Sequence, residues 1–229
     1  GIALPKTPKH YGNTDHNSTD AIYQTNDLAQ KFYHHLLLND KKGKQALSYL
    51  KSRNVTDEVI QQFGIGYAPG GESWDELLRV ARKRNIDPNT LERSGLAVKR
   101  KSGNGHYDRF RDRVVFPIRN VSSKTIGFGG RVLQVGQEPK YLNSPETPIY
   151  QKSRVLYGLD TAKDTIRQAK SAIVVEGYMD VISLAQAGIE NVVATSGTAL
   201  TESQCMAMER FADQAVLLFD GDNAGSNAA

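Results

Sequence analysis

The sequence predicts an α/β fold in two parts, a mixed α+β amino-terminal subdomain followed by a smaller subdomain built on a parallel sheet. Over the last 70 residues, short apolar β-rich runs alternate with helical patterns, which is typical of parallel strands covered by helices. Before them, helical patterns give way near Gly95 to two longer β-rich runs. With 229 residues, 39% of them hydrophobic, the chain can bury one large core or two modest ones.

The first part of the chain divides into a linker and a subdomain. Residues 1–20 are polar, rich in Pro, Gly and Asn, and lack periodicity, so we expect a linker. Residues 21–158 are expected to form the amino-terminal subdomain. Apolar spacing and capping residues predict its helices, and β-rich runs predict its strands. The predicted helices cover 21–38, 45–53, 57–63 and 73–84, with one more opening at Asp87-Pro88, and the predicted strands cover 106–118 and 125–135.

The second subdomain is expected to span 159–229. Its predicted helices cover 159–169, 178–187 and 202–212, and its predicted strands cover 172–175, 191–194 and 215–219.

Composition narrows the class of protein. The net charge of +4 is unevenly distributed: residues 99–170 carry 15 Lys and Arg against 6 Asp and Glu, whereas residues 171–229 carry 1 against 8. A basic surface beside an acidic pocket suits an enzyme that holds a polyanion and binds metal ions. The one cysteine, Cys205, excludes a disulfide framework and a multi-cysteine zinc site. Because no signal peptide or membrane-spanning stretch is visible, we expect a cytoplasmic protein without a membrane partner.

Acidic residues follow two of the predicted parallel strands. Glu176 comes directly after one strand, and Asp220 and Asp222 come after another. Ligands collect outside the carboxyl ends of such strands, and carboxylates there suit a hard cation such as Mg²⁺. A single acid after a strand is more often a turn or a helix cap. A calcium loop is a poor fit, because Ala224 stands at a ligand position.

A basic segment precedes these acids. Arg109 and Arg111 are two residues apart, so in a strand both would face the same side, where their guanidinium groups could bind phosphate. Lys140 and Tyr141 pair a cation with a ring on which a base can stack. Taken singly, each of these could also be ordinary solvent-exposed charge on a sheet.

Two motifs carry a family resemblance. Val175-Glu-Gly-Tyr-Met-Asp180 and Phe219-Asp-Gly-Asp-Asn-Ala-Gly225 resemble the two halves of the TOPRIM fold, a Rossmann-like parallel sheet that binds metal. The segments 109–119, 127–131 and 139–147 make the chain resemble the catalytic core of DnaG-type bacterial DNA primases over residues 21–229.

The resemblance implies template-directed synthesis of short RNA primers on single-stranded DNA, by nucleotidyl transfer from ribonucleoside triphosphates. It implies that Glu176, Asp220 and Asp222 form the catalytic centre and hold Mg²⁺ or Mn²⁺, with the role of Glu176 open between metal binding and proton transfer. It further implies a basic nucleotide and nucleic-acid site made of Arg53, Arg109, Arg111, Arg131, Lys140, Tyr141, Asn143 and Lys152. Beside Arg53, Asn54 replaces the glycine usual in this family.

The resemblance also bears on what surrounds the core. Family members begin with a zinc-binding domain and end with a region that contacts the replicative helicase, and we expect both to lie outside this chain. The TOPRIM subdomain is expected to be incomplete at Ala229, and the activity of the chain alone is left open. Two other classes stay open: a TOPRIM nuclease or topoisomerase, and a non-enzymatic module that binds single-stranded nucleic acid.

Overall fold

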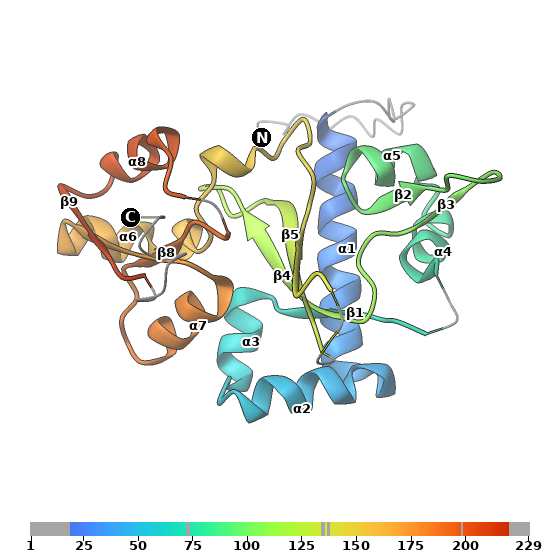
Figure 1. The fold of residues 1–229 in the computed structure, drawn as a ribbon, viewed down its shortest axis with the longest axis horizontal. Helices are drawn as coiled ribbons and strands as arrows, with labels where there is room; N and C mark the ends of the chain where they lie inside the picture. The colour runs from blue at the N-terminus through green and yellow to red at the C-terminus, as the bar shows by residue number, and fades with distance from the viewer. Residues whose placement is uncertain (1–18, 72–73, 134–135, 137, 198, 220–229) are drawn as a thin grey trace, which may run out of the picture.

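The computed structural model describes residues 19–71, 74–133, 136, 138–197 and 199–219. The amino-terminal lobe combines helices with an antiparallel sheet (Figure 1). Its α-helices are α1 (Thr19–Asn39), α2 (Lys44–Ser52), α3 (Asp57–Phe63), α4 (Glu76–Arg82) and α5 (Pro88–Arg93). Its strands are β1 (Gly66–Ala68), β2 (Ala97–Lys99), β3 (His106–Asp108), β4 (Arg113–Arg119), β5 (Thr125–Val132) and β6 (Tyr141–Asn143), and short 3₁₀ helices cover Lys41–Gly43 and Lys152–Arg154.

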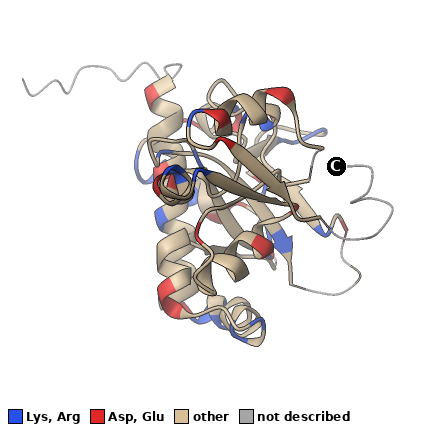
Figure 2. Cartoon of the chain, turned by 90° about the vertical axis from the view of Figure 1, so that its left-hand side faces the viewer, with Lys and Arg blue, Asp and Glu red and all other residues tan. Residues whose placement is uncertain are grey.

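The carboxyl-terminal lobe alternates helices and strands as expected. It contains α6 (Leu159–Ala169), β7 (Ser171–Val175), α7 (Tyr178–Gln186), β8 (Val192–Ala194), α8 (Glu202–Glu209) and β9 (Gln214–Leu217). The strands form a parallel sheet in the order β8-β7-β9. In Figure 2, which looks onto this lobe, these strands are tan because they contain no charged residue. The mixed and parallel-sheet fold class is therefore confirmed.

The antiparallel sheet of the first lobe is the middle layer of the molecule. Its strand order is β1-β4-β5-β6, and β4 is buried on both faces. Alternate β4 residues point to opposite sides. Val115 packs in a core with Tyr33 of α1, while Phe116 belongs to a second core that includes Tyr178 of α7. One hydrophobic core is thus shared between the two lobes.

Local signals explain where the helices begin and end. Thr56 caps α3, because its hydroxyl accepts the Val59 N–H, and Asp87 caps α5 in the same way through Asn89. Helix α1 begins at Thr19, slightly before the expected boundary at residue 21. None of the helices in the described ranges combines the length and the apolar character needed to cross a membrane.

Two expectations about strands are corrected. The predicted strand over 106–118 is two strands, since β3 ends at Asp108, β4 begins at Arg113, and Asp112 between them has a φ of 51°. The apolar strands of the second subdomain were expected to be covered by helices on both faces. Strand β9, however, lies at the edge of its sheet and is exposed throughout, including Val216 and Leu217.

Candidate active site

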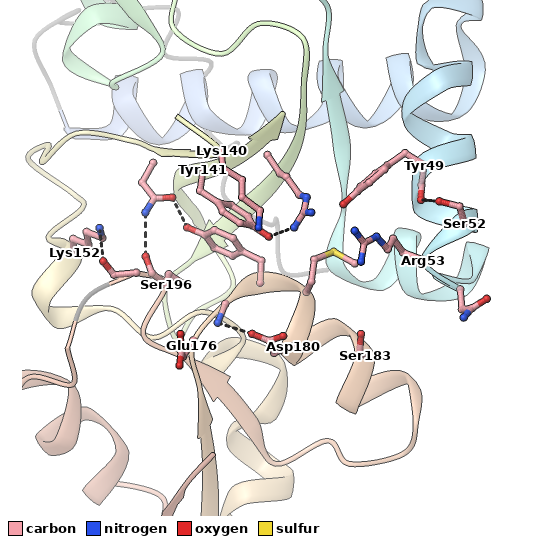
Figure 3. Close-up of a pocket in the computed structure, with 17 residues that line it drawn as sticks. Tyr49, Ser52, Arg53, Lys140, Tyr141, Lys152, Glu176, Asp180, Ser183 and Ser196 are labelled. Atoms are coloured by element: carbon pink, nitrogen blue, oxygen red, sulfur yellow. Dashed lines mark hydrogen bonds between the residues drawn. The ribbon is translucent and has the colours of Figure 1, made fainter. Parts of the chain in front are cut away.

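A cleft of about 1010 Å³ lies between the two lobes and brings together residues from both (Figure 3). The amino-terminal lobe lines it with side chains from α2, β5, β6 and the segments near them, and the carboxyl-terminal lobe adds the start of α7 and the turn after β8. Its lining residues are Tyr49, Ser52, Arg53, Asn54, Arg131, Lys140, Tyr141, Asn143, Lys152, Glu176, Gly177, Tyr178, Met179, Asp180, Ser183, Ser196 and Gly197.

The acidic side of the cleft is built at the end of β7. Glu176 directly follows this strand, and its carbonyl accepts the Ser196 N–H at 3.0 Å. Asp180 lies in the first turn of α7, where its carboxylate accepts the Gly177 N–H at 2.9 Å. This bond fixes the turn between strand and helix, so both carboxylates face the cleft (Figure 3).

The other two predicted acids, Asp220 and Asp222, lie outside the described residues. Strand β9 runs parallel to β7, and the described chain continues past it to Phe219. Within the described ranges, no group of three or more His, Cys, Asp or Glu side chains forms a metal site. Glu176 therefore supplies the one predicted ligand whose position is described.

On the basic side, Arg131 of β5 is held between two aromatic rings. Its guanidinium carbon lies 5.5 Å from the centre of the Tyr49 ring and 5.2 Å from that of Tyr141. It also donates a hydrogen bond to the Tyr141 hydroxyl. Burial raises the pKa of Tyr141, so this hydroxyl stays neutral near pH 7. The cation is consequently oriented in advance of any ligand.

A hydrogen-bonded chain joins the two lobes at the opposite end of the cleft. The buried Tyr178 hydroxyl donates to Asn143 Oδ1 at 2.7 Å, and Asn143 Nδ2 donates to the Ser196 carbonyl at 3.1 Å. Lys152 Nζ donates to the neighbouring Gly197 carbonyl at 3.4 Å. Because Tyr178 fixes the amide of Asn143, the turn after β8 is held beside Glu176.

The structure brings most of the predicted site residues together. The cleft is lined by Arg53, Arg131, Lys140, Tyr141, Asn143, Lys152 and Glu176. Asn54, where the family usually has glycine, adopts a left-handed φ of 60°, a conformation that Asn tolerates better than most residues. The replacement therefore leaves Arg53 at the cleft.

Arg109 and Arg111 are not among the lining residues, and the assumption that they share a strand face is wrong. They lie in the break between β3 and β4. The Arg109 guanidinium donates to the Asn143 carbonyl at 3.1 Å, and burial lowers its pKa. Arg111 instead stacks on Trp74 and Tyr107, with ring centres at 4.2 and 4.9 Å. The two guanidinium groups therefore contact different parts of the molecule.

Sequence reasoning missed several residues of this surface. Tyr49, Ser52, Met179, Asp180 and Ser183 line the cleft, and Trp74, 48% exposed, supports Arg111 outside it. Asp180 had a usable signal, because it stands four residues after Glu176 in the quoted motif. The others depend on contacts between distant segments, which no local pattern reveals.

Asp108, whose carboxyl group is buried, bonds to both Trp74 and Arg111 through its backbone. Its two oxygens accept the Leu77 and Leu78 N–H groups at 2.8 and 3.1 Å, and its carbonyl accepts a bond from Arg111. Burial raises the pKa of Asp108 to about 6, although the two N–H bonds act in the opposite direction. The Asp108 carboxyl therefore anchors the start of α4. Because it is buried, its ionised form is destabilised.

The raised pKa predicts a pH dependence of stability. Between the unfolded pKa of about 4 and the folded value of about 6, the folded protein binds more protons, so its stability falls as pH rises. We expect the unfolding free energy of wild type, relative to Asp108→Asn, to fall by about 1–3 kcal/mol from pH 3.5 to 7. Urea unfolding at several pH values measures this difference, and a difference that stays flat or rises would contradict the assignment.

Comparison with known proteins defines the class first. The sequence profile of the Toprim-like family matches residues 173–229, the segment that contains the end of β7, all of α7 and the acidic motifs. This part of the chain is therefore a Toprim-like domain, in which a strand-end glutamate faces a basic cleft.

A second profile identifies the particular family. The profile described as "DNA primase catalytic core, N-terminal domain" matches residues 32–163, more than half of the chain. The chain belongs to the family of DnaG-type DNA primase catalytic cores.

Individual relatives agree with this membership. The chain is 46% identical to a DNA primase of Halalkalibacterium halodurans, over 91% of this chain and 34% of that protein. It superposes with a TM-score of 0.84 on a DNA primase domain from Pseudomonas aeruginosa, at 44% identity, covering 90% of this chain and 64% of that one. A DnaG primase catalytic domain bound to single-stranded DNA gives a TM-score of 0.83 at 41% identity, covering 91% and 66%. The chain spans about a third of the length of the curated relatives it matches.

Proposed function

We propose that this chain is the part of a DNA primase in which short RNA primers are made on a single-stranded DNA template. The reaction joins ribonucleoside triphosphates: the 3′-hydroxyl of the growing RNA attacks the α-phosphate of the incoming nucleotide, and pyrophosphate leaves. One observation carries the proposal, namely the cleft in which basic and aromatic side chains of one lobe face Glu176 on the other. Such a reaction depends mainly on positioning and on neutralising phosphate charge.

The basic wall is proposed to hold the triphosphate. Arg131 is oriented by Tyr49 and Tyr141, so little freedom is lost when it binds phosphate. Lys140 and Lys152 add positive charge along the same wall, and Arg53 stands near the α2 end. Together these groups can neutralise the charge on a triphosphate in a partly enclosed site.

The acidic wall is proposed to hold divalent metal. Glu176 offers a carboxylate to the cleft, which is a ligand that hard cations prefer, and Asp220 and Asp222 are proposed as the further ligands. The donor set therefore fits Mg²⁺ or Mn²⁺, which when bound would neutralise the phosphates and favour the attacking hydroxyl. Zinc is expected only in a domain outside this chain.

The template is proposed to pass the surface that carries Arg109 and Arg111. Trp74 and Tyr107 supply exposed or half-exposed rings there, and rings beside arginines suit single-stranded nucleic acid. The similarity to a primase domain bound to single-stranded DNA supports single-stranded DNA as the ligand of this protein. We also propose action in the cytoplasm, with the replicative helicase contacted through a region outside this chain.

Replacement of Arg131 tests the proposal. We expect the full-length protein that carries this sequence to incorporate labelled ribonucleotides on single-stranded DNA with Mg²⁺ or Mn²⁺. Arg131→Ala should lower kcat/KM for the incoming nucleotide about 10²-fold, because an oriented charge at the phosphates is lost. Arg167→Ala, at an exposed position on α6, is the matched control and should change little.

Two results of the same assays would favour a different function. Cleavage of supercoiled or single-stranded DNA without templated RNA would favour a Toprim nuclease or topoisomerase. DNA binding that needs no metal, again without RNA, would favour a non-enzymatic binding module.

A further inference from the structure

Helix α7 forms one wall of the cleft and also reaches the opposite lobe. Met179, Asp180 and Ser183 line the cleft along this helix. Gln186, the last residue of α7, lies three positions beyond Ser183, so it continues roughly the same side of the helix. There it meets the turn between α2 and α3, which carries Arg53.

The carboxamide of Gln186 makes two hydrogen bonds to the backbone of that turn. Its Nε2 donates to the Asn54 carbonyl at 2.7 Å, and its Oε1 accepts the Thr56 N–H at 2.9 Å. A donor and an acceptor on one planar group thus bind two backbone groups that are two residues apart. Such a paired contact fixes orientation as well as distance.

The other N–H groups of the turn are bonded within the amino-terminal lobe. Arg53 N–H and Val55 N–H both donate to the Leu50 carbonyl, at 3.1 and 3.0 Å, and Asn54 N–H donates to the Lys51 carbonyl at 2.9 Å. Asn54 nevertheless sits at a φ of 60°, a conformation less favourable for a residue with a side chain. One of the two bonds from Gln186 is therefore made to the carbonyl of the residue that has the positive φ.

We infer that Gln186 is a positioning residue for Arg53. By holding the Asn54–Thr56 backbone against the end of α7, it sets where Arg53 stands relative to the wall that carries Asp180 and Glu176. The inference rests on the proposed function, in which Arg53 contacts the incoming triphosphate. Gln186 itself is exposed and is not among the residues that line the cleft.

Removal of the carboxamide should weaken nucleotide binding more than it weakens chemistry. In the full-length protein, we expect Gln186→Ala to raise KM for ribonucleotides about 3- to 10-fold, the range that follows from losing one or two hydrogen bonds. The kcat should stay within about 2-fold, because the groups at the reacting phosphate are untouched. Gln168→Ala, an exposed glutamine on α6, is the matched control and should leave both constants unchanged.

A double-mutant cycle separates positioning from a general structural effect. If Gln186 acts through Arg53, then Gln186→Ala in an Arg53→Ala background should change KM by less than about 2-fold further. The inference would be overturned if the increases in KM caused by Gln186→Ala and Arg53→Ala multiplied in the double variant. It would also be overturned if Gln186→Ala lowered kcat at constant KM. An unchanged KM in Gln186→Ala beside a raised KM in Arg53→Ala would overturn it as well, while leaving the proposed function standing. Absence of templated RNA in wild type would overturn the proposed function, and the inference with it.

Discussion

Replacing Glu176 by Gln should lower templated RNA synthesis by about 10³-fold or more, whereas binding of single-stranded DNA should stay within about 2-fold. The carboxylate lines the cleft at the end of β7, opposite Arg131 and Lys140. Gln preserves the size of the side chain but removes its charge and one acceptor oxygen, so the change tests the carboxylate and not the space it fills. Metal-dependent incorporation of labelled ribonucleotides and a DNA-binding titration measure the two quantities.

The control for this variant is Glu209→Gln, an exposed carboxylate on α8 in the same lobe. It should leave synthesis unchanged. Asp220→Asn is expected to reproduce the loss, because the same acidic centre is proposed to include it. Retention of synthesis in Glu176→Gln would remove this residue from the catalytic centre, and retention in Asp220→Asn would contradict the metal assignment.

Replacing Gly129 by Ala is expected to destabilise the protein by about 3 kcal/mol, at the upper end of the usual cost of overpacking. A Cβ at this position of β5 would lie 2.5 Å from the Tyr178 hydroxyl oxygen and closer still to its ring. Tyr178 cannot retreat easily, because its ring stacks on Phe116 with centres 5.2 Å apart. Thermal unfolding should show Tm lower by about 6–12 °C.

The matched control is Gly127→Ala in the same strand. Its Cβ would meet Ser144 and Tyr150 at 3.3 Å, a tight contact that a small shift relieves. We therefore expect a clearly smaller loss of stability than for Gly129→Ala. Equal Tm values for the two variants would show that Tyr178 does not depend on the space above Gly129.

Much of the fold could be predicted because its signals are local. The residues Asp57–Phe63 form α3 with Thr56 as its cap, as apolar spacing and capping chemistry indicate. The alternation after residue 158 likewise predicted the order of α6, β7, α7, β8, α8 and β9. The break between β3 and β4 gives no local signal of this kind: β3 ends at Asp108, whose carboxyl contacts α4, and Asp112 has a positive φ.

The candidate site was only partly predictable for the same reason. Motif resemblance indicated Glu176 and Arg131, and the cleft contains both. Arg111 was expected beside them but stacks on Trp74, a residue distant in sequence. Gln186 gives no signal in sequence, since its role depends on reaching the Asn54 backbone across 132 positions.

The hydrophobic core shared by the two lobes limits how they can be exchanged. Phe116 of the first lobe and Tyr157, which bonds to the backbone of β8, both contact the Tyr178 ring of the second lobe. A chimera that took one lobe from this protein and the other from a homologue would bring together aromatic partners that did not evolve against each other. Such a hybrid should stay folded only where the three rings are inherited as a set. The two lobes are therefore expected to depend on each other for stability, although each has its own sheet.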